Sequence, residues 1–336
     1  SVFGTTLNPY DLSKTCGGSS GGGAVALATG MVALADGTDL GGSLRNPANF
    51  CNLVGMRPSV GRVPTWPEQL GWYTMSVAGP MARNVEDLAL MMSVLSGPDD
   101  RSPIALESPG SIFHTPLQRN FKGCKVAYSE DLGGLPLEPE VRTVMRAARE
   151  IFERLGCEVI DDEIDLNEAG EIFMMWRAWR TELRIAPLLT SHKDQLKDTV
   201  IWNAEQGVGL TGPQMARAEA KRTEIYHRMR EFMNTYEFFV LPVNQVVPFS
   251  VDLDYPREIN GVKMETYIDW QKTAYFISAM GNPAISVPAG FTDSGLPVGV
   301  QIVGGHRQDL AVLQMAYAFE QVTQFGLQRP AICTVA

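Results

Sequence analysis

The fold is decided by residues 16–45, which read CGGSSGGGAVALATGMVALADGTDLGGSLR. This stretch holds two serine sites set among glycines, Gly-Gly-Ser-Ser-Gly-Gly at 17–22 and Gly-Gly-Ser at 41–43. Glycine at this density indicates backbone that adopts conformations other residues avoid, or backbone that is approached very closely. Hydroxyls among glycines are also where acyl-transfer enzymes place nucleophiles and oxyanion donors. Ser19 and Ser43 are therefore the candidate reactive groups.

Composition limits the classes of protein that this chain can belong to. It has 336 residues, of which 45% are hydrophobic and 20% charged, as is ordinary for a globular protein. The net charge of −10 and the absence of a Lys/Arg-rich run argue against a nucleic-acid partner. No apolar run in the sequence is long enough to span a membrane. The five cysteines are scattered without CxxC or Cys/His spacing, which predicts reduced thiols in a cytoplasmic protein and no zinc site.

Local patterns predict alternating helices and strands. Small apolar residues at 22–34 predict a closely packed helix that begins just after the first serine site, and a short strand is predicted at 33–39. Further helices are predicted at 46–54, 84–95, 139–155, 264–281 and 310–325, with a helical region at 167–237. Further strands are predicted at 125–128, 157–160, 238–242, 284–287 and 298–303. Strand–helix–strand alternation implies an α/β layer.

Two segments are rich in turn-forming residues and predict irregular structure. They are residues 1–18 and residues 55–83, the second with four prolines and four glycines. The second segment also supplies Trp72, Tyr73 and Met75, which are candidate residues of a substrate pocket.

The serines indicate acyl-transfer chemistry of a defined kind. A serine hydroxyl becomes a good nucleophile when a base within hydrogen-bond reach takes its proton. The backbone N–H groups of the turn that ends at Ser43 are preorganised donors for the oxyanion of a tetrahedral intermediate. A second serine placed between nucleophile and base can relay the proton.

The glycine–serine motifs closely resemble those of the amidase signature family, whose members hydrolyse amide bonds with a Ser–cis-Ser–Lys triad. The resemblance rests on GGSSGG and on GTDLGGSLRNPANFCNLVGMRPSVGRVP. It extends to GPMAR at 79–83, GNPAISVP at 281–288 and GLPVGVQ at 295–301. It covers nearly the whole chain and is weakest at 165–235.

The resemblance implies a fold and a domain organisation. The implied fold is α/β, with a mixed twisted β-sheet core flanked by helices on both faces. Residues 1–336 would form a single domain that lacks its N-terminal segment. Within it we expect a signature core at 1–97, a linker at 98–120 and an α/β remainder at 121–336 that includes a variable helical region at 165–237.

The resemblance also assigns roles to residues of the two serine sites. Ser43 would be the acylating nucleophile and Ser19 the cis-serine that relays its proton. The remaining assignments are the oxyanion-hole backbone of Leu40, Gly41 and Gly42, a supporting ion pair of Asp39 and Arg45, and a helix N-cap at Ser20.

One element of the family's triad has no match. The lysine of the triad lies well upstream of the cis-serine, and nothing before Ser19 matches that segment. Lys14 is interpreted as a surface lysine rather than a displaced base, because a lysine acting as base must be neutral. We therefore expect the base to lie outside this chain, and the chain alone to hydrolyse amides poorly.

Two alternatives remain open on the sequence alone. Residues 17–21 also fit the GxSxG nucleophile elbow, which would make Ser19 the nucleophile of an α/β-hydrolase with His306 as its base. That motif needs a preceding strand, which residues 12–16 do not predict. The second alternative is a complex-forming component similar to amidotransferase A chains, which release ammonia from glutamine for a partner.

The sequence therefore predicts an amidase, a cytoplasmic hydrolase acting on carbon–nitrogen bonds other than peptide bonds. The expected partner is a small-molecule amide or related acyl compound, with no nucleic acid, membrane, metal or organic cofactor involved. A homodimer is the candidate assembly. Together with the three candidate pocket residues, Trp176 and Trp179 favour an apolar or aromatic substrate.

Overall fold

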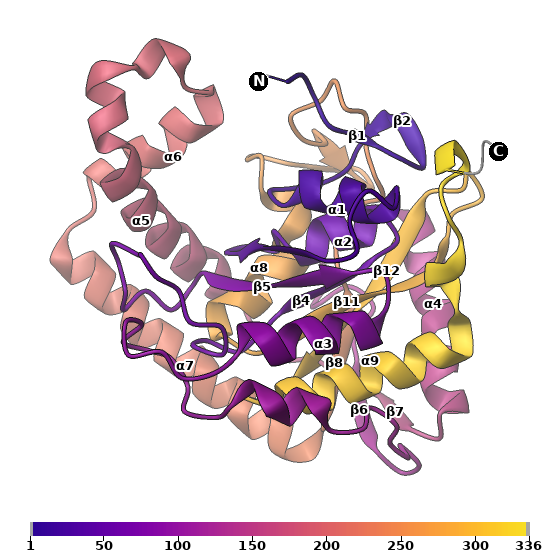
Figure 1. Cartoon of the computed structure of the whole chain (residues 1–336). Helices are drawn as coiled ribbons and strands as arrows, with labels where there is room; N and C mark the ends of the chain where they lie inside the picture. The colour runs from indigo at the N-terminus through magenta and orange to yellow at the C-terminus, as the bar shows by residue number, and fades with distance from the viewer. Residues whose placement is uncertain (1–2, 334–336) are drawn as a thin grey trace.

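A mixed eight-stranded sheet forms the centre of the molecule (Figure 1). The computed structural model describes residues 3–333. The strand order is β3 (Ala35–Asp39), β5 (Val77–Ala82), β4 (Val54–Arg57), β11 (Ala284–Phe291), β12 (Pro297–Gly304), β8 (Phe238–Pro242), β6 (Lys125–Tyr128) and β7 (Glu158–Asp161). Neighbours from β3 to β8 run antiparallel, whereas β6 is parallel to both β8 and β7. The predicted mixed sheet is confirmed.

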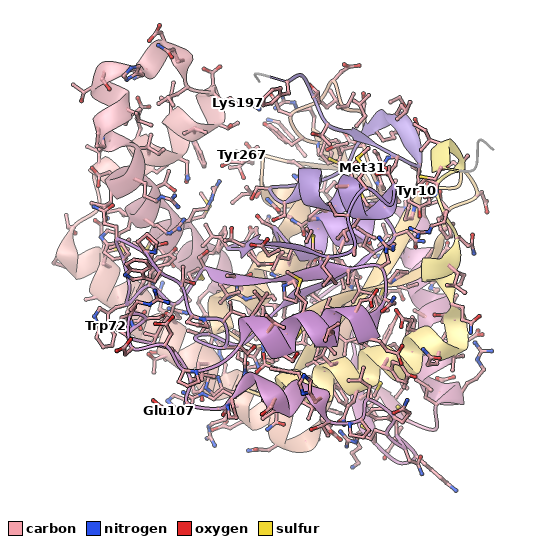
Figure 2. All side chains as sticks on the ribbon, viewed as in Figure 1. Tyr10, Met31, Trp72, Glu107, Lys197 and Tyr267 are labelled. Carbon is pink, nitrogen blue, oxygen red and sulfur yellow. The ribbon has the colours of Figure 1, made fainter. Side chains whose placement is uncertain are left out.

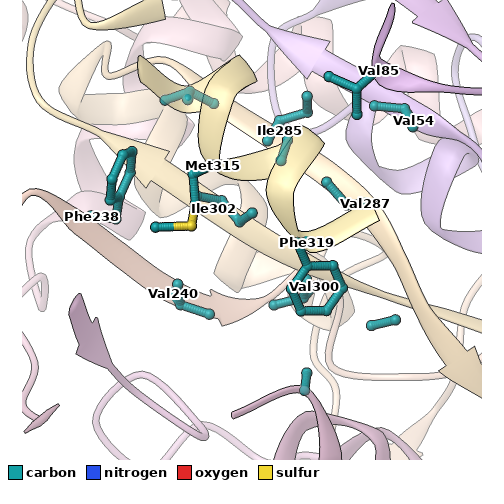
Figure 3. Close-up of a cluster of buried hydrophobic side chains, with 14 of the residues drawn as sticks. Val54, Val85, Phe238, Val240, Ile285, Val287, Val300, Ile302, Met315 and Phe319 are labelled. Carbon is teal, nitrogen blue, oxygen red and sulfur yellow. The ribbon is translucent and has the colours of Figure 1, made fainter. Parts of the chain in front are cut away.

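One face of the sheet is covered by α3 (Val85–Leu95), α4 (Pro139–Arg154) and α9 (Asp309–Thr323). Each helix presents an apolar stripe, and their buried side chains join those of β4, β8, β11 and β12 in one core. Figure 3 shows Met315 and Phe319 of α9 over Val300 and Ile302 of β12. This core holds the sheet rigid behind the serine sites.

The opposite face is covered by α5 (Ala169–Ser191), α7 (Gly212–Thr235) and α8 (Lys272–Met280), whose buried residues form a second core with the sheet. α5 continues beyond the sheet and packs with α6 (Asp198–Val208), so that the two helices project from the body as an arm (Figure 1). α1 (Gly21–Ala28) and α2 (Arg45–Phe50) follow the first and second serine sites. α1 packs on β3 and β5, and α2 packs on β4, β11 and β12. Predicted helices are thus found on both faces.

The remaining elements are short. They are β1 (Leu7–Asn8), β2 (Asp11–Thr15), η1 (Gly110–His114), η2 (Lys193–Gln195), β9 (Glu258–Ile259), β10 (Val262–Lys263), η3 (Asp269–Gln271), η4 (Phe325–Leu327) and η5 (Ala331–Cys333). Within residues 3–333, no helix combines the length and the apolar character needed to cross a bilayer.

The two segments predicted to be irregular contain strands. β1 and β2 pair within residues 1–18, β5 lies within residues 55–83, and β4 begins at Val54 and extends into that segment. Gly79 and Pro80 made β5 look unlike a strand, yet it lies between β3 and β4 in the sheet. A Cβ at Gly79 would lie 2.6 Å from the carbonyl oxygen of Met56, so close strand packing explains this glycine. Tertiary packing therefore overrides local propensity here.

The segment at 98–120, predicted as a linker, packs on the core. Phe113 and Leu117 are buried in the same core as α3 and α9. The sheet takes strands from both sides of this segment, so the segment does not separate two sheets. The predicted helix at 22–34 is also shorter than expected, because α1 ends at Ala28 and Gly30 follows with φ of +79°.

Candidate active site

Ser43 lies in a sharp turn between β3 and α2 that only glycines can form. Gly42 has φ of +110°, a conformation that side chains disfavour, and a Cβ there would lie 2.4 Å from Oδ1 of Asn46. A Cβ at Gly41 would lie 2.7 Å from Cζ of Phe173 on α5. The two glycines therefore fix the backbone of the turn and let α5 approach it.

The carboxylate of Asp39 holds this turn from inside the protein. It accepts hydrogen bonds from the backbone N–H of Gly42 at 2.9 Å and of Leu44 at 3.3 Å. Nε and Nη2 of Arg45 donate to its two oxygens at 3.0 and 2.9 Å, and Nη1 of Arg57 lies 3.3 Å away. The three side chains are fully buried. The predicted ion pair of Asp39 and Arg45 is present.

The charges in this cluster stabilise one another. Burial alone would raise the pKa of Asp39, but Arg45, Arg57 and the Gly42 N–H outweigh it and hold the pKa well below its usual range. Burial lowers the pKa of Arg57 to about 10, although Asp39 opposes that shift. The Asp39 carboxylate is therefore ionised at neutral pH and is available as an acceptor for the turn.

Arg45 connects the turn to the rest of the protein. Its guanidinium donates to Oγ of Ser278 on α8 at 2.7 Å and to Oε1 of Gln301 on β12. Five donors in a rigid plane suit arginine to this bridging role. The nucleophile turn is thereby anchored to two elements more than 200 residues away in the sequence.

The N–H of Gly42, a predicted oxyanion donor, is donated to Oδ1 of Asp39 at 2.9 Å within the turn. The N–H groups of Gly41 and Ser43 make no hydrogen bond to another group among the described residues. These two donors, with that of Leu40, are the ones left for a ligand.

Ser19 lies on a neighbouring loop that is joined to the nucleophile turn through the backbone. The peptide bond between Gly18 and Ser19 is cis. The N–H of Ser20 donates to the carbonyl oxygen of Ser43 at 3.2 Å, which links the two loops directly. Ser20 occupies the N-cap position of α1, but its side chain makes no capping hydrogen bond. Its Oγ instead packs against Gly37 of β3.

Both serine sites open onto one cavity of about 690 Å³. Gly18, Ser19, Leu40, Gly41 and Ser43 line one side of it. The arm of α5 and α6 lines the other side, with Phe173, Arg177, Arg180, Thr181, Arg184, Thr199, Val200 and Asn203. The remaining lining residues are Thr38, Glu68, Ser76, Asp254, Tyr267, Ile268, Trp270 and Gln271, and Figure 2 shows Tyr267 on the side of the body that faces the arm. The structure therefore brings the two predicted reactive serines together.

The three predicted pocket residues do not line this cavity. Trp72 is 76% exposed and lies at the outer surface (Figure 2). Tyr73 and Met75 are buried in the core under α5, where Tyr73 packs against Trp176 and Trp179. Their side chains fill space between the loop and α5 and lie outside the cavity shared by Ser19 and Ser43.

The residues that do line the cavity were missed because they lie in the helical region at 165–237. A signal was present, since residues 173, 177, 180 and 184 recur at intervals of four, three and four. That spacing places them on one face of a helix. Recognising this face as a cavity wall required knowing what it packs against.

No lysine or histidine is among the described residues that line the cavity. Lys14 pairs with Ser250 at the edge of β2, away from the lining. His306 belongs to a separate cavity with Tyr226 and Asn282. The α/β-hydrolase alternative needs His306 as the base for Ser19, and His306 does not line the cavity that contains Ser19. Contrary to our expectation β2 is a strand, but it pairs with β1 and not with the central sheet.

No group of three or more His, Cys, Asp or Glu side chains within residues 3–333 is placed to hold a metal ion.

Comparisons with known proteins agree with this architecture. The Amidase family model matches residues 1–313. An acylamidase of Rhodococcus erythropolis is 34% identical over 335 residues, which cover 98% of this chain and 70% of the relative. The A subunit of glutamyl-tRNA(Gln) amidotransferase from Synechococcus sp. (strain RCC307) is 30% identical over 361 residues, covering 100% of this chain and 73% of the relative.

Solved structures show the same fold. A bacterial aryl acylamidase of the amidase signature family superposes with a TM-score of 0.91 at 28% identity, covering 99% of this chain and 71% of that chain. The A subunit of glutamyl-tRNA(Gln) amidotransferase from Thermotoga maritima gives a TM-score of 0.72 at 27% identity, with 96% and 69% covered.

Fold and site together define a hydrolase of the amide-cleaving class. The chain belongs to the amidase signature family.

Proposed function

We propose that this chain hydrolyses a small-molecule amide through an acyl-enzyme on Ser43. The observation that carries the proposal is the glycine turn of Ser43, which is locked by the buried Asp39 carboxylate and opens onto the same cavity as Ser19. Such a turn presents a nucleophile and oxyanion donors without reorganisation during the reaction.

In the proposed reaction, Oγ of Ser43 attacks the amide carbonyl carbon while its proton passes to Ser19. The carbonyl oxygen becomes an oxyanion held by backbone N–H groups of the turn, of which those of Gly41 and Ser43 have no other acceptor among the described residues. The leaving amine takes a proton and departs, and water then hydrolyses the acyl-enzyme. Because Ser19 relays the proton, it serves both halves of the reaction.

Ser19 itself needs a base. In the proposed triad this is a lysine, and no lysine lines the cavity in the described structure. We propose that the lysine is supplied from outside the described residues of this chain. The chain by itself is then expected to turn over amides slowly, and a normal amidase rate from the purified chain would overturn this part of the proposal.

Three serine variants test the proposed roles by hydrolysis of an anilide. Ser43→Ala removes the nucleophile, and we expect its loss of kcat to be the largest of the three. Ser19→Ala removes the relay, and when the lysine is also supplied we expect a loss of about 10²- to 10⁴-fold in kcat, as for a lost acid–base group. Ser20→Ala is the matched control on the same loop and is expected to stay within a few fold of the parent. Equal losses for Ser19→Ala and Ser20→Ala would contradict the relay.

A second candidate function is that of an amidotransferase component. It is favoured by the 30% identity to the A subunit of a glutamyl-tRNA(Gln) amidotransferase over the full chain. Under this alternative, release of ammonia from glutamine would depend on ATP and on a partner protein. Hydrolysis of simple amides without either one supports the amidase.

A further inference from the structure

The wall of the cavity opposite the serines carries three arginines on one helix face. Phe173 contacts the Ser43 turn, and Arg177, Arg180 and Arg184 follow it along α5 at helical spacing. At about 1.5 Å of rise per residue, Arg177 lies about 6 Å further along the axis than Phe173. The arginines therefore begin one turn of helix away from the backbone that holds the reacting carbonyl.

Arg177 stands out among these arginines because its charge is not paired. Its Nη2 donates to the hydroxyl of Tyr267, and its guanidinium lies 4.9 Å from the centre of that ring. Its Nη1 is buried without a hydrogen-bond partner, and no carboxylate lies within ion-pair distance of it among residues 3–333. Burial lowers the pKa of Arg177 to about 10, so the guanidinium remains charged at neutral pH.

The neighbouring arginines differ from Arg177. The Nε of Arg180 is also buried without a hydrogen-bond partner, but the charge of Arg180 is paired with Glu68 at 3.5 Å, and Arg184 is exposed. The cavity therefore has three arginines against two carboxylates, those of Glu68 and the exposed Asp254. This positive balance contrasts with the net charge of −10 of the chain.

A buried arginine with an unpaired N–H destabilises the protein unless an acceptor forms a hydrogen bond with that N–H. We propose that the cavity binds amides that also carry a carboxylate, and that Arg177 is the residue that receives this carboxylate. Guanidinium and carboxylate match in a planar, two-point geometry, which gives orientation as well as affinity. The proposal rests on the proposed amide hydrolysis, since it names the class of substrate for the same site.

Binding to a non-reacting variant tests the proposal apart from turnover. Glutaranilic acid and hexananilide are the probes, because they share an anilide and a similar chain but only the first bears a carboxylate. Each is titrated by calorimetry into the full chain carrying Ser43→Ala, at low and at high salt. We expect the acid to bind about 10- to 100-fold more tightly, as for a charge-assisted hydrogen-bonded pair, and less so at high salt.

Variants of Arg177 assign the effect to that residue. In the Ser43→Ala background, Arg177→Gln should remove most of the preference for the acid, whereas Arg177→Lys should retain part of it. Arg217→Gln, an exposed arginine on α7 outside the cavity, is the matched control and should keep the full preference.

The outcomes separate this inference from the proposed function. Equal affinity for the two probes, or a preference that survives Arg177→Gln, overturns the inference. The comparison of the two probes on Ser43→Ala alone decides the matter if Arg177→Gln does not fold. Reaction of a serine-directed reagent at another serine, with Ser43 unmodified, would instead overturn the proposed function and leave a measured carboxylate preference standing.

Discussion

Asp39 and Arg45 form a buried, two-point ion pair that holds the nucleophile turn from behind. The two atoms Nε and Nη2 of Arg45 reach both oxygens of Asp39, and the same carboxylate accepts the N–H of Gly42. Geometry at Ser43 is thus coupled to an ion pair that has no access to solvent. Changes to this ion pair, or to the packing around the turn, should therefore reach the reacting serine.

Replacing Asp39 by Asn should both destabilise the protein and disturb the turn. The change leaves the charges of Arg45 and Arg57 buried without their carboxylate. Breaking a buried ion pair in this way costs about 3–5 kcal/mol, which urea denaturation would measure. Asp99→Asn is the matched control, because Asp99 pairs with Arg101 at the surface, and its midpoint should shift little. Similar shifts for the two variants would contradict the role given to the buried pair.

Gly42→Ala should reduce reaction at Ser43 more than it changes the fold elsewhere. The new Cβ would lie 2.4 Å from Oδ1 of Asn46 and 2.7 Å from Cβ of Ala274, in backbone with φ of +110°. The turn must therefore move, and we expect the rate of acylation to fall by at least about 10²-fold, as when an oxyanion donor is lost.

Gly134→Ala is the matched control for Gly42→Ala. It introduces a side chain at a positive φ without a steric clash. Gly134 has φ of +87°, but a Cβ placed on it would have no heavy atom within 4 Å. This variant should lose about 1 kcal/mol of stability and keep its acylation rate. An unchanged acylation rate in Gly42→Ala would contradict the claim that the close packing around Gly42 positions Ser43.

Glu320 should make stability depend on pH. Burial raises its pKa from the ordinary 4.5 to about 7, and nearby Glu86 and Asp87 act in the same direction. Because the folded state holds this proton more tightly than the unfolded state, stability is full below about pH 4.5 and is lost as the pH rises towards 7.

Glu320→Gln should abolish that pH dependence, since glutamine does not ionise and can still accept from the N–H of Val85. Thermal unfolding from pH 4 to 8 would measure it, with the exposed Glu150→Gln on α4 as control. A parent stability that does not change between pH 4 and 8 would be inconsistent with a raised pKa of Glu320. So would a pH dependence that Glu320→Gln leaves unchanged.

Much of this fold could be predicted from the sequence where local pattern and tertiary role agree. The apolar stripe of α4 and the buried run of β8 are examples, because burial itself sets their periodicity. The two serines were identifiable from their glycine neighbours, and the Asp39–Arg45 pair was implied by the resemblance to the amidase signature family.

Other features depend on contacts that no local pattern reveals. β5 is a strand in spite of Pro80 because β3 and β4 enclose it. The N–H of Gly42 is occupied because Asp39 folds back beneath it. Trp72, a predicted pocket residue, lies at the surface, whereas Arg177, which the sequence analysis did not single out, lines the cavity. The position of β5 and the wall of the cavity are both set by contacts with elements that are remote in sequence.

The most direct test of the central claim is to identify the serine that reacts. The full chain is incubated with an alkyl fluorophosphonate, and the modified residue is located by peptide mapping and mass spectrometry, with denatured chain as control. We expect one adduct on Ser43 in the folded chain and none in the denatured chain. An adduct on Ser19 with Ser43 unmodified would contradict the assignment of Ser43 as the nucleophile.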